Sequence, residues 1–311
     1  MISSEHFVYA LDARYLEINN QKEFSAAISE GRYAYLRIKC NIRLKDIYKK
    51  IGDDVSSWDM SECFDMSDMF ENCEKFNSDL SAWDVSACTD MHSMFCHCFQ
   101  FNGDLSAWDV SACKTMNLMF HNCRKFGSDL STWDVSACKS MGFMFYDCHQ
   151  FNGNLSRWNV SACTDMRWMF CDCYQFNSDL SAWDVSACKY MHYMFHNCYQ
   201  FNGDISTWDV SACKKMSYMF RDCYKFNSDL SRWNVSACKS VASMFCDCHK
   251  FNSDLSTWDV SACEDMSFMF DGCKKFNADL SAWNISACKN MAHMFKNCYL
   301  SDNKKPQKIE S

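Results

Sequence analysis

The sequence carries 24 cysteines, and their spacing is the first feature that could support chemistry. Two columns of cysteine recur every 25 residues, one through Cys88 and one through Cys98. Thiols at regular spacing can form disulfides, bind metal ions or remain buried and reduced. The first column contains Cys63, Cys88, Cys113, Cys138, Cys163, Cys188, Cys213, Cys238, Cys263 and Cys288, and the second contains Cys73, Cys98, Cys123, Cys148, Cys173, Cys198, Cys223, Cys248, Cys273 and Cys298.

Geometry disfavours a disulfide within one 25-residue unit. If the intervening segment is helical, Cys88 and Cys98 lie about 15 Å apart, whereas a disulfide needs Cα atoms within about 7 Å. Equivalent cysteines on successive units would be close enough to pair. Such disulfides would join the units in twos and would give a 50-residue alternation, which neither cysteine column shows. We therefore expect structural ladders of buried, reduced thiols, with disulfides and metal binding as the alternatives.

The metal alternative rests on three Cys-x-Cys pairs, the first of which has His92 and His97 nearby. The pairs are spaced 75 residues apart, so about 15 Å separates them and they cannot share one zinc ion. A site at any pair would need ligands from a neighbouring unit. The sequence alone therefore predicts no metal site and no cofactor. The pairs are Cys96 and Cys98, Cys171 and Cys173, and Cys246 and Cys248.

The polar residues give no support for catalysis. A nucleophile and its base form a single constellation, yet almost every polar residue here belongs to a set of about ten copies. A glycine-rich phosphate loop, a nucleophile elbow and an HExxH motif are all missing from the sequence. We expect a protein without enzymatic activity.

The side chains in the column of Asp84 could bind calcium or could form structural hydrogen bonds. It holds Asp in seven units and Asn at 159, 234 and 284. Stacked carboxylates could gather calcium, but Asn replaces Asp freely, which favours a hydrogen-bonding role that needs only the shared oxygen.

Charge and hydropathy exclude two classes of partner. There are 31 Lys and Arg against 39 Asp and Glu, a net charge of −8 without a basic block, which argues against nucleic acid. No apolar run approaches 18 residues, so we expect no membrane span. Glu5, Asp12, Arg14 and Glu17 interrupt the segment in which a signal peptide needs an apolar run, which predicts an intracellular location.

Ten consecutive copies of one 25-residue unit fill residues 51–300. A period of this size indicates a solenoid, in which each unit is one coil and the coils stack. The frame Leu80-x-x-Trp83-x-Val85-x-x-Cys88 matches the leucine-rich repeat, and Trp83 and Val85 would share one face of a short strand. We predict a right-handed, leucine-rich-repeat-like stack whose single coils cannot fold alone.

The second half of each coil is predicted to be helical. Cys88, Met91, Phe95 and Cys98 are spaced by 3, 4 and 3, which is one face of a short α-helical or 3₁₀ segment. A polar return over 76–79 then leads into the next strand.

The ends depart from the repeat. Residues 1–50 are predicted to be a small α/β cap, with strands over 6–11 and 34–42 and helices over 21–29 and 44–51. Residues 301–311 are polar and are expected to be a disordered tail. A short tail would leave Met294 and Phe295 of the last coil uncovered, so a second copy could associate end to end there.

The unit read from FNSDLSAWDVSACTDMHSMF resembles the BspA-like leucine-rich repeat family of the DUF285 type, over about 80% of the chain. The resemblance implies an interaction or cell-surface protein, often adhesive, of the kind found in bacteria, protists and large DNA viruses. It would place the chain on a cell or virion surface. The chain is a cysteine-rich variant, because the family usually has Asn-Val where Ala87-Cys88 stands.

Variable aromatic residues suggest where a partner would bind. They occupy the columns of Ser93 and Phe99 and are densest in coils four to seven. An exposed aromatic stripe resembles the centre of an interface, although the rings could instead only seal neighbouring coils. We predict a non-enzymatic solenoid that presents this surface to a protein partner; the alternatives are a structural assembly protein and thiol-based metal or redox buffering. The candidate binding residues are Phe143, Trp168, Tyr193, Tyr218, Phe268, Tyr174, Tyr199 and Tyr224.

Overall fold

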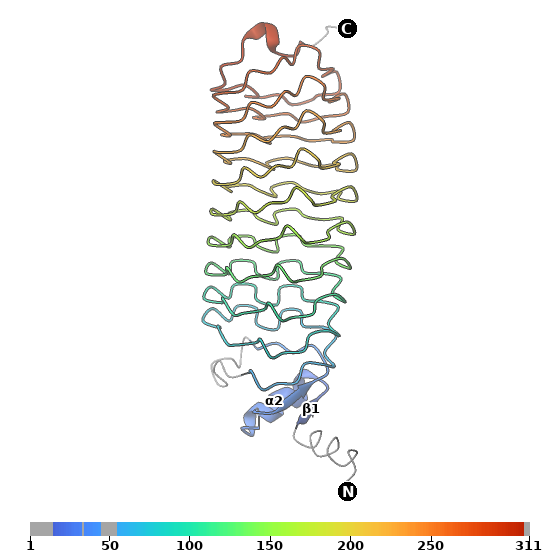
Figure 1. Cartoon of the computed structure of the whole chain (residues 1–311), viewed down its shortest axis with the longest axis vertical. Helices are drawn as coiled ribbons and strands as arrows, with labels where there is room; N and C mark the ends of the chain where they lie inside the picture. Colours follow the sequence, from blue (N-terminus) through green and yellow to red (C-terminus); the bar gives the residue numbers. More distant parts are fainter. Residues whose placement is uncertain (1–14, 33, 45–54, 308–311) are drawn as a thin grey trace.

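The computed structural model describes residues 15–32, 34–44 and 55–307 and shows a long stack of similar chain turns with a small cap at its N-terminal end (Figure 1). Each turn is one 25-residue repeat, and we number the coils from 1 (residues 51–75) to 10 (residues 276–300). Regular elements are few: β1 (Leu16–Ile18), α2 (Gln21–Ser29), β2 (Leu36–Ile38) and the 3₁₀ helix η1 (Asp302–Lys304). Among the described residues, no helix has the length and apolar character that crossing a bilayer requires.

The cap is built around α2. The helix begins after Asn20, whose side chain accepts a hydrogen bond from the Glu23 amide, and it buries Phe24, Ala27 and Ile28 on one face. The helix predicted over 21–29 is therefore confirmed. The strand predicted over 34–42 is shorter, because only β2 pairs with a neighbour, in parallel with β1. The strand predicted over 6–11 and residues 45–51 of the other helix lie outside the described residues.

β2 joins the cap to the first coil. Arg37 pairs with Asp59 as an isolated parallel bridge, and the Ile38 amide donates to the Asp59 carbonyl at 2.9 Å. The Arg37 guanidinium also contacts the Asp59 carboxylate at 2.7 Å. Phe24 packs edge-on against Trp58, with ring centroids 5.6 Å apart. The cap thus covers the apolar flank of coil 1, with its bridge at Asp59 instead of the Asp90 column and with an edge-on ring contact instead of a parallel one.

A buried ladder of aromatic rings and cysteines repeats about every 25 residues along the stack. Successive indoles lie parallel, with Trp133 and Trp158 at 6.4 Å between centroids. The phenylalanines stack likewise, with Phe120 and Phe145 at 5.6 Å. The tryptophans of the repeat are 2–4% exposed. Because each ring needs neighbours above and below, its burial depends on the stack as a whole.

Side-chain donors tie each coil to the one before it. The Trp108 Nε1 donates to the Leu80 carbonyl at 2.9 Å, and the Cys98 thiol donates to the Phe70 carbonyl at 3.0 Å. Both carbonyls also accept an amide of their own coil, from Trp83 and Cys73 respectively. Each buried carbonyl therefore uses both of its lone pairs, which explains why Trp and Cys recur at these positions.

The helical segment predicted for each coil is wrong. In coil 2 the residues from 91 to 98 form consecutive turns, because Ser93 and His97 adopt the left-handed conformation with φ of 53° and 62°. The Ser93 amide donates to Asn117 in the next coil, whereas the Met94 amide donates to Met91 in its own coil. A helix would keep all of these donors within one coil, so the alternation is what bonds the stack together.

The strand predicted around Trp83 is also absent. Trp83 and Val85 are buried and Asp84 between them is exposed, as the alternation predicts. The segment lies between two turns, and the Ser86 amide donates to the Asp84 carboxylate at 3.0 Å. The only strand-like pairing within residues 55–307 is one isolated parallel bridge per junction, at the column of Asp90.

Residues 301–307 differ from the disordered tail predicted for 301–311. The chain folds back through η1, and the Leu280 amide donates to the Lys304 carbonyl at 2.8 Å. The Lys305 ammonium lies 5.7 Å from the Phe295 ring centroid, and Leu300 and Pro306 are buried. Met294 is 3% exposed, so the prediction that it would be uncovered is wrong, whereas Phe295 is half-exposed. The last coil is thereby partly covered.

Candidate functional site

Four rings predicted to bind a partner form one continuous stack, here called the aromatic stripe. Phe143, Trp168, Tyr193 and Tyr218 come from coils 4, 5, 6 and 7. Their successive centroid distances are 5.6, 3.8 and 4.3 Å, with nearly parallel planes. Each ring is half-buried, so one side of the stack is sealed and the other meets solvent.

The backbone of the stripe is unusual for such bulky residues. All four have φ between 59° and 61°, in the left-handed region that costs a side chain about 1–2 kcal/mol. The Phe143 amide donates to the Arg167 carbonyl of the next coil at 2.9 Å, and the other rings make the equivalent bond. Coil-to-coil bonding thus holds the conformation that displays the rings.

A second set of rings, here called the tyrosine row, contains Tyr174, Tyr199 and Tyr224. The centroids are spaced 5.0 Å apart at both steps, and His149 and His249 extend the stack at its two ends. Tyr224 is 39% exposed. Burial, together with the Asp172 carboxylate, raises the pKa of Tyr174 to about 12, so its hydroxyl remains a hydrogen-bond donor at neutral pH.

Phe268 does not belong to the aromatic stripe. Ser243 occupies the intervening position of the column, and Phe268 instead contacts His293 with centroids 5.0 Å apart. Of the eight candidate residues, the structure brings together four in the stripe and three in the row.

The sequence reasoning missed three residues that contact the stripe. Tyr146 lies 5.6 Å from Trp168 between ring centroids, His196 lies 5.7 Å from Tyr193, and the Arg221 guanidinium lies 5.6 Å from the Tyr218 ring. All three occupy the column of Cys96, in which only the cysteines were predicted to carry chemistry. The available signal was that this column, like that of Ser93, varies between coils.

The two cysteine ladders are structural. Of the 24 cysteines, 22 are buried, and the structure holds them as thiols. The ladder through Cys98 donates to phenylalanine carbonyls of the preceding coil, and in the other ladder the Cys88 thiol donates to the Asp90 carbonyl at 3.2 Å. Burial raises the pKa of Cys138 to about 11 and that of Cys213 to about 12. These groups are therefore protonated at neutral pH and are poor nucleophiles.

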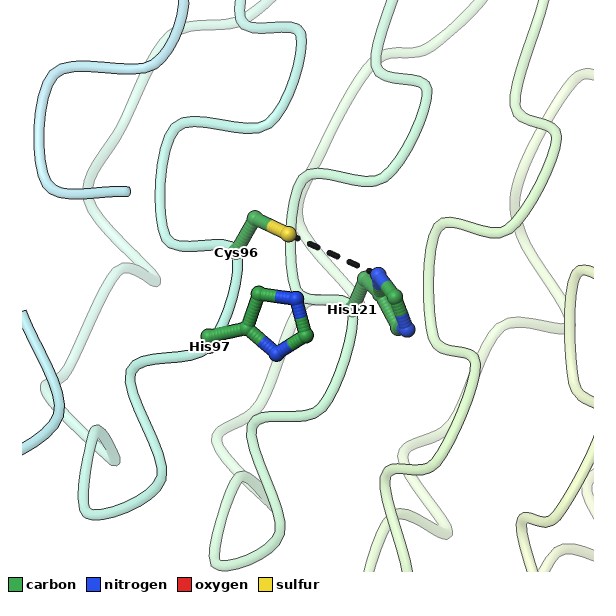
Figure 2. Close-up of side chains that lie close together, drawn as sticks. All are labelled: Cys96, His97 and His121. Carbon is green, nitrogen blue, oxygen red and sulfur yellow. Dashed lines mark hydrogen bonds between the residues drawn. The ribbon is translucent and has the colours of Figure 1, made fainter. Parts of the chain in front are cut away.

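One cysteine outside the two ladders lies against two histidines. The ligand atoms of Cys96, His97 and His121 are all within 4.8 Å of one another (Figure 2). The Cys96 sulfur is 3.5 Å from Nδ1 of His121, which comes from the next coil. Burial, with His97 nearby, lowers the pKa of His121 to about 4, so its imidazole is neutral at pH 7. No metal site was predicted from the sequence, because the neighbouring coil supplies the third residue.

Comparison with known proteins identifies the family. A family model described as "Mycoplasma protein of unknown function, DUF285" matches three times in tandem, over residues 42–156, 125–229 and 204–308. The chain therefore belongs to the DUF285 family. No curated protein matches the chain significantly. No solved structure matches it either.

Proposed function

We propose that the chain is a non-enzymatic interaction protein that binds a protein partner through the aromatic stripe and the tyrosine row. The observation that carries the proposal is the stack of Phe143, Trp168, Tyr193 and Tyr218, half-exposed over four successive coils. Tyr, Trp, Phe and Arg are the residues enriched at the centres of protein interfaces.

The stripe is already ordered before a partner arrives. Each ring is held between neighbours, so binding would immobilise few additional side chains, and this reduces the entropic cost of association. Asp147 and Asp172 occupy successive positions of the adjacent left-handed column, Asn197 takes the next position and Asp222 the one after it, and all three aspartates are half-buried. This chemistry suits a partner surface that combines apolar groups with Lys or Arg.

We further propose that the ten coils form a right-handed solenoid related to leucine-rich repeats. Support comes from the single parallel bridge between successive coils and from the buried apolar columns of each 25-residue unit. Such arrays bind partners along their length because neighbouring coils present equivalent positions in line.

Replacing Trp168, Tyr193 and Tyr218 together with Ser tests the interaction proposal. The matched control replaces three exposed aromatic residues elsewhere, Tyr35 and Phe64 and Tyr299, with Ser. Proteins captured from cells that produce the chain would be identified, and the affinity of a purified partner would then be measured by calorimetry. We expect the stripe variant to lose at least tenfold in affinity while the control retains it. Equal affinity for both variants, with both folded, would disprove the proposal.

The alternative function is assembly of a structural or surface protein on a cell or virion. It is favoured by the last coil, in which Met291 and Phe295 remain half-exposed and Tyr299 is 80% exposed. Light scattering over a range of protein concentration separates the two functions. Assembly is favoured if the mass of the unchanged chain rises with concentration while the mass of the Tyr299→Ser variant stays at the monomer value.

A further inference from the structure

The cluster of Cys96, His97 and His121 is built from two adjacent coils, and their backbones hold it in register. Cys96 and His97 belong to coil 2 and His121 to coil 3. The His97 amide donates to the His121 carbonyl at 2.8 Å, which fixes the two histidines relative to each other. His97, with φ of 62°, is the third residue of a turn within coil 2, which the Cys98 amide closes on the Phe95 carbonyl.

The distances match a tetrahedral ion. Zinc binds thiolate sulfur at about 2.3 Å and imidazole nitrogen at about 2.0 Å, so two such ligands lie about 3.5 Å apart. The Cys96 sulfur and the His121 Nδ1 are 3.5 Å apart. Nδ1 of His97 contacts the Asn122 amide at 2.9 Å, and the other ring nitrogen points toward the Cys96–His121 pair (Figure 2).

We propose that Cys96, His97 and His121 bind one zinc-class divalent cation, with water as the fourth ligand. The Cys96 thiol releases its proton to solvent on binding, and the thiolate and two neutral imidazoles become the protein ligands. The cation links coils 2 and 3. This site is independent of the proposed partner-binding face.

Neighbouring groups favour a cation at this place. Burial and, to a smaller extent, the carboxylates of Glu71 and Asp68 raise the pKa of the Cys96 thiol to about 12. The negative charges that disfavour a free thiolate favour a cation bound to it. Asn122 lies next to Nδ1 of His97 and is not itself a ligand. When the Asn122 amide is turned so that its oxygen faces Nδ1, the oxygen accepts a hydrogen bond from the Nδ1–H of the metal-bound imidazole.

The same column holds cysteine twice more, and neither position repeats the ligand set. At Cys171, the position of His97 is taken by Asp172, and the Nδ1 of His196 contacts the Arg221 carbonyl at 3.3 Å. At Cys246 the equivalent positions hold Asp247 and Asp271. Within the described residues, the Cys96 cluster is the only group of three or more His, Cys, Asp and Glu ligands whose atoms converge in this way. The proposal therefore specifies one tight site per chain.

Cobalt(II) is the probe for the test, because a thiolate ligand gives it a charge-transfer absorption band. The full chain would be reduced with a phosphine, stripped with a chelator and titrated with cobalt, and zinc would then be added in competition. We expect one equivalent of cobalt to produce the thiolate band and one equivalent of zinc to remove it.

The variants use residues that the chain already places in the same columns. His97→Asn preserves a side chain suited to φ > 0, as at Asn122, and His121→Tyr copies Tyr146. Each is expected to weaken cobalt binding more than about 100-fold, since even outer-shell changes cost 10- to 100-fold. Cys96→Ser should abolish the band.

Cys171→Ser is the matched control, because Cys171 is buried in the same column, Asp172 stands in place of the first histidine, and His196 contacts the Arg221 carbonyl instead. It should leave the stoichiometry and the band unchanged. The proposal is overturned if the intact chain gives no band at one equivalent. It is equally overturned if Cys171→Ser lowers the affinity as much as Cys96→Ser does, or if His97→Asn remains folded and binds cobalt as tightly as the unchanged chain.

Discussion

The inner and outer columns of the coils follow opposite rules. Inner columns such as those of Trp183 and Cys173 repeat one residue in almost every coil, and they are buried and hydrogen-bonded in the same way each time. Outer columns such as that of Trp168 change from coil to coil on the same left-handed backbone. Uniform inner columns make every coil stackable, and the outer columns are therefore free to carry different chemistry at different heights.

This separation places two candidate sites on one scaffold. Coils 2 and 3 carry the Cys96, His97 and His121 cluster, whereas coils 4 to 7 carry the aromatic stripe. Both use outer columns, in which the stripe residues and the two histidines are half-buried and Cys96 is buried. The comparison predicts large effects from changes to inner columns and small effects on folding from changes to outer ones.

Alkaline pH should produce the largest effect, because it acts on all inner thiols at once. Burial raises the pKa of Cys138 from 9.0 to about 11 and that of Cys163 to about 12. The unfolded chain therefore loses these protons first, so the stabilisation is complete below pH 9 and decreases as the pH rises toward the folded values. Between the unfolded and the folded pKa of one such thiol, each unit of pH increase lowers the unfolding free energy by about 1.4 kcal/mol.

The nine thiols of this ladder from Cys63 to Cys263 all have a raised pKa, and together they would remove about 13 kcal/mol per pH unit, which is comparable to the whole stability of a typical domain. We expect the chain to unfold cooperatively within about one pH unit above pH 9. Tryptophan fluorescence, measured in the presence of a reductant, would monitor this unfolding. Thiol titration at pH 7 should detect most of the cysteines only after denaturation. Thiolate formation at pH 9 in a chain that stays folded would contradict this account.

A single inner change should have an intermediate effect. Trp183→Phe removes the Nε1 donor to the Leu155 carbonyl and leaves a void between the neighbouring indoles. The lost hydrogen bond and the void together should lower the unfolding free energy by about 2–3 kcal/mol. The outer control in the same coil is Tyr199→Phe, for which we expect a change below about 0.5 kcal/mol in urea unfolding. Equal effects of the two changes would mean that the inner and outer columns do not differ as described.

The buried columns could be predicted from the sequence, but the backbone that carries them could not. The alternation of Trp83, Asp84 and Val85 gave their burial correctly, yet it implied a strand that does not form. The 3, 4, 3 spacing through Met91 and Phe95 suggested a helix, whereas successive tight turns also return side chains to one face every three or four residues. Periodicity reports which face a side chain occupies, and different backbones can satisfy the same pattern.

The Cys96 cluster could not be derived from one coil, because it depends on the register between two. Cys96 and His121 are 25 residues apart, and they meet only because the His97 amide bonds to the His121 carbonyl. The stripe shows the same limit. Nothing in local propensity places Trp168 at a φ of 59°, since the conformation is held by stacking and by bonds to the next coil.

The smallest change in unfolding free energy is expected where an outer residue with positive φ is replaced by glycine. Leu118 has φ of 58° and is half-buried, and its amide donates to the Gly142 carbonyl at 3.0 Å. Leu118→Gly loses partial burial and adds unfolded-state entropy, but it relieves about 1–2 kcal/mol of left-handed strain. The net change in unfolding free energy should stay below about 1 kcal/mol.

Met119→Gly, at the next and fully buried position, should cost at least about 3 kcal/mol in the same urea measurement, because nothing offsets its cavity. If Leu118→Gly were as costly as Met119→Gly, the outer columns would be essential to the fold, and they could not vary freely to form binding sites.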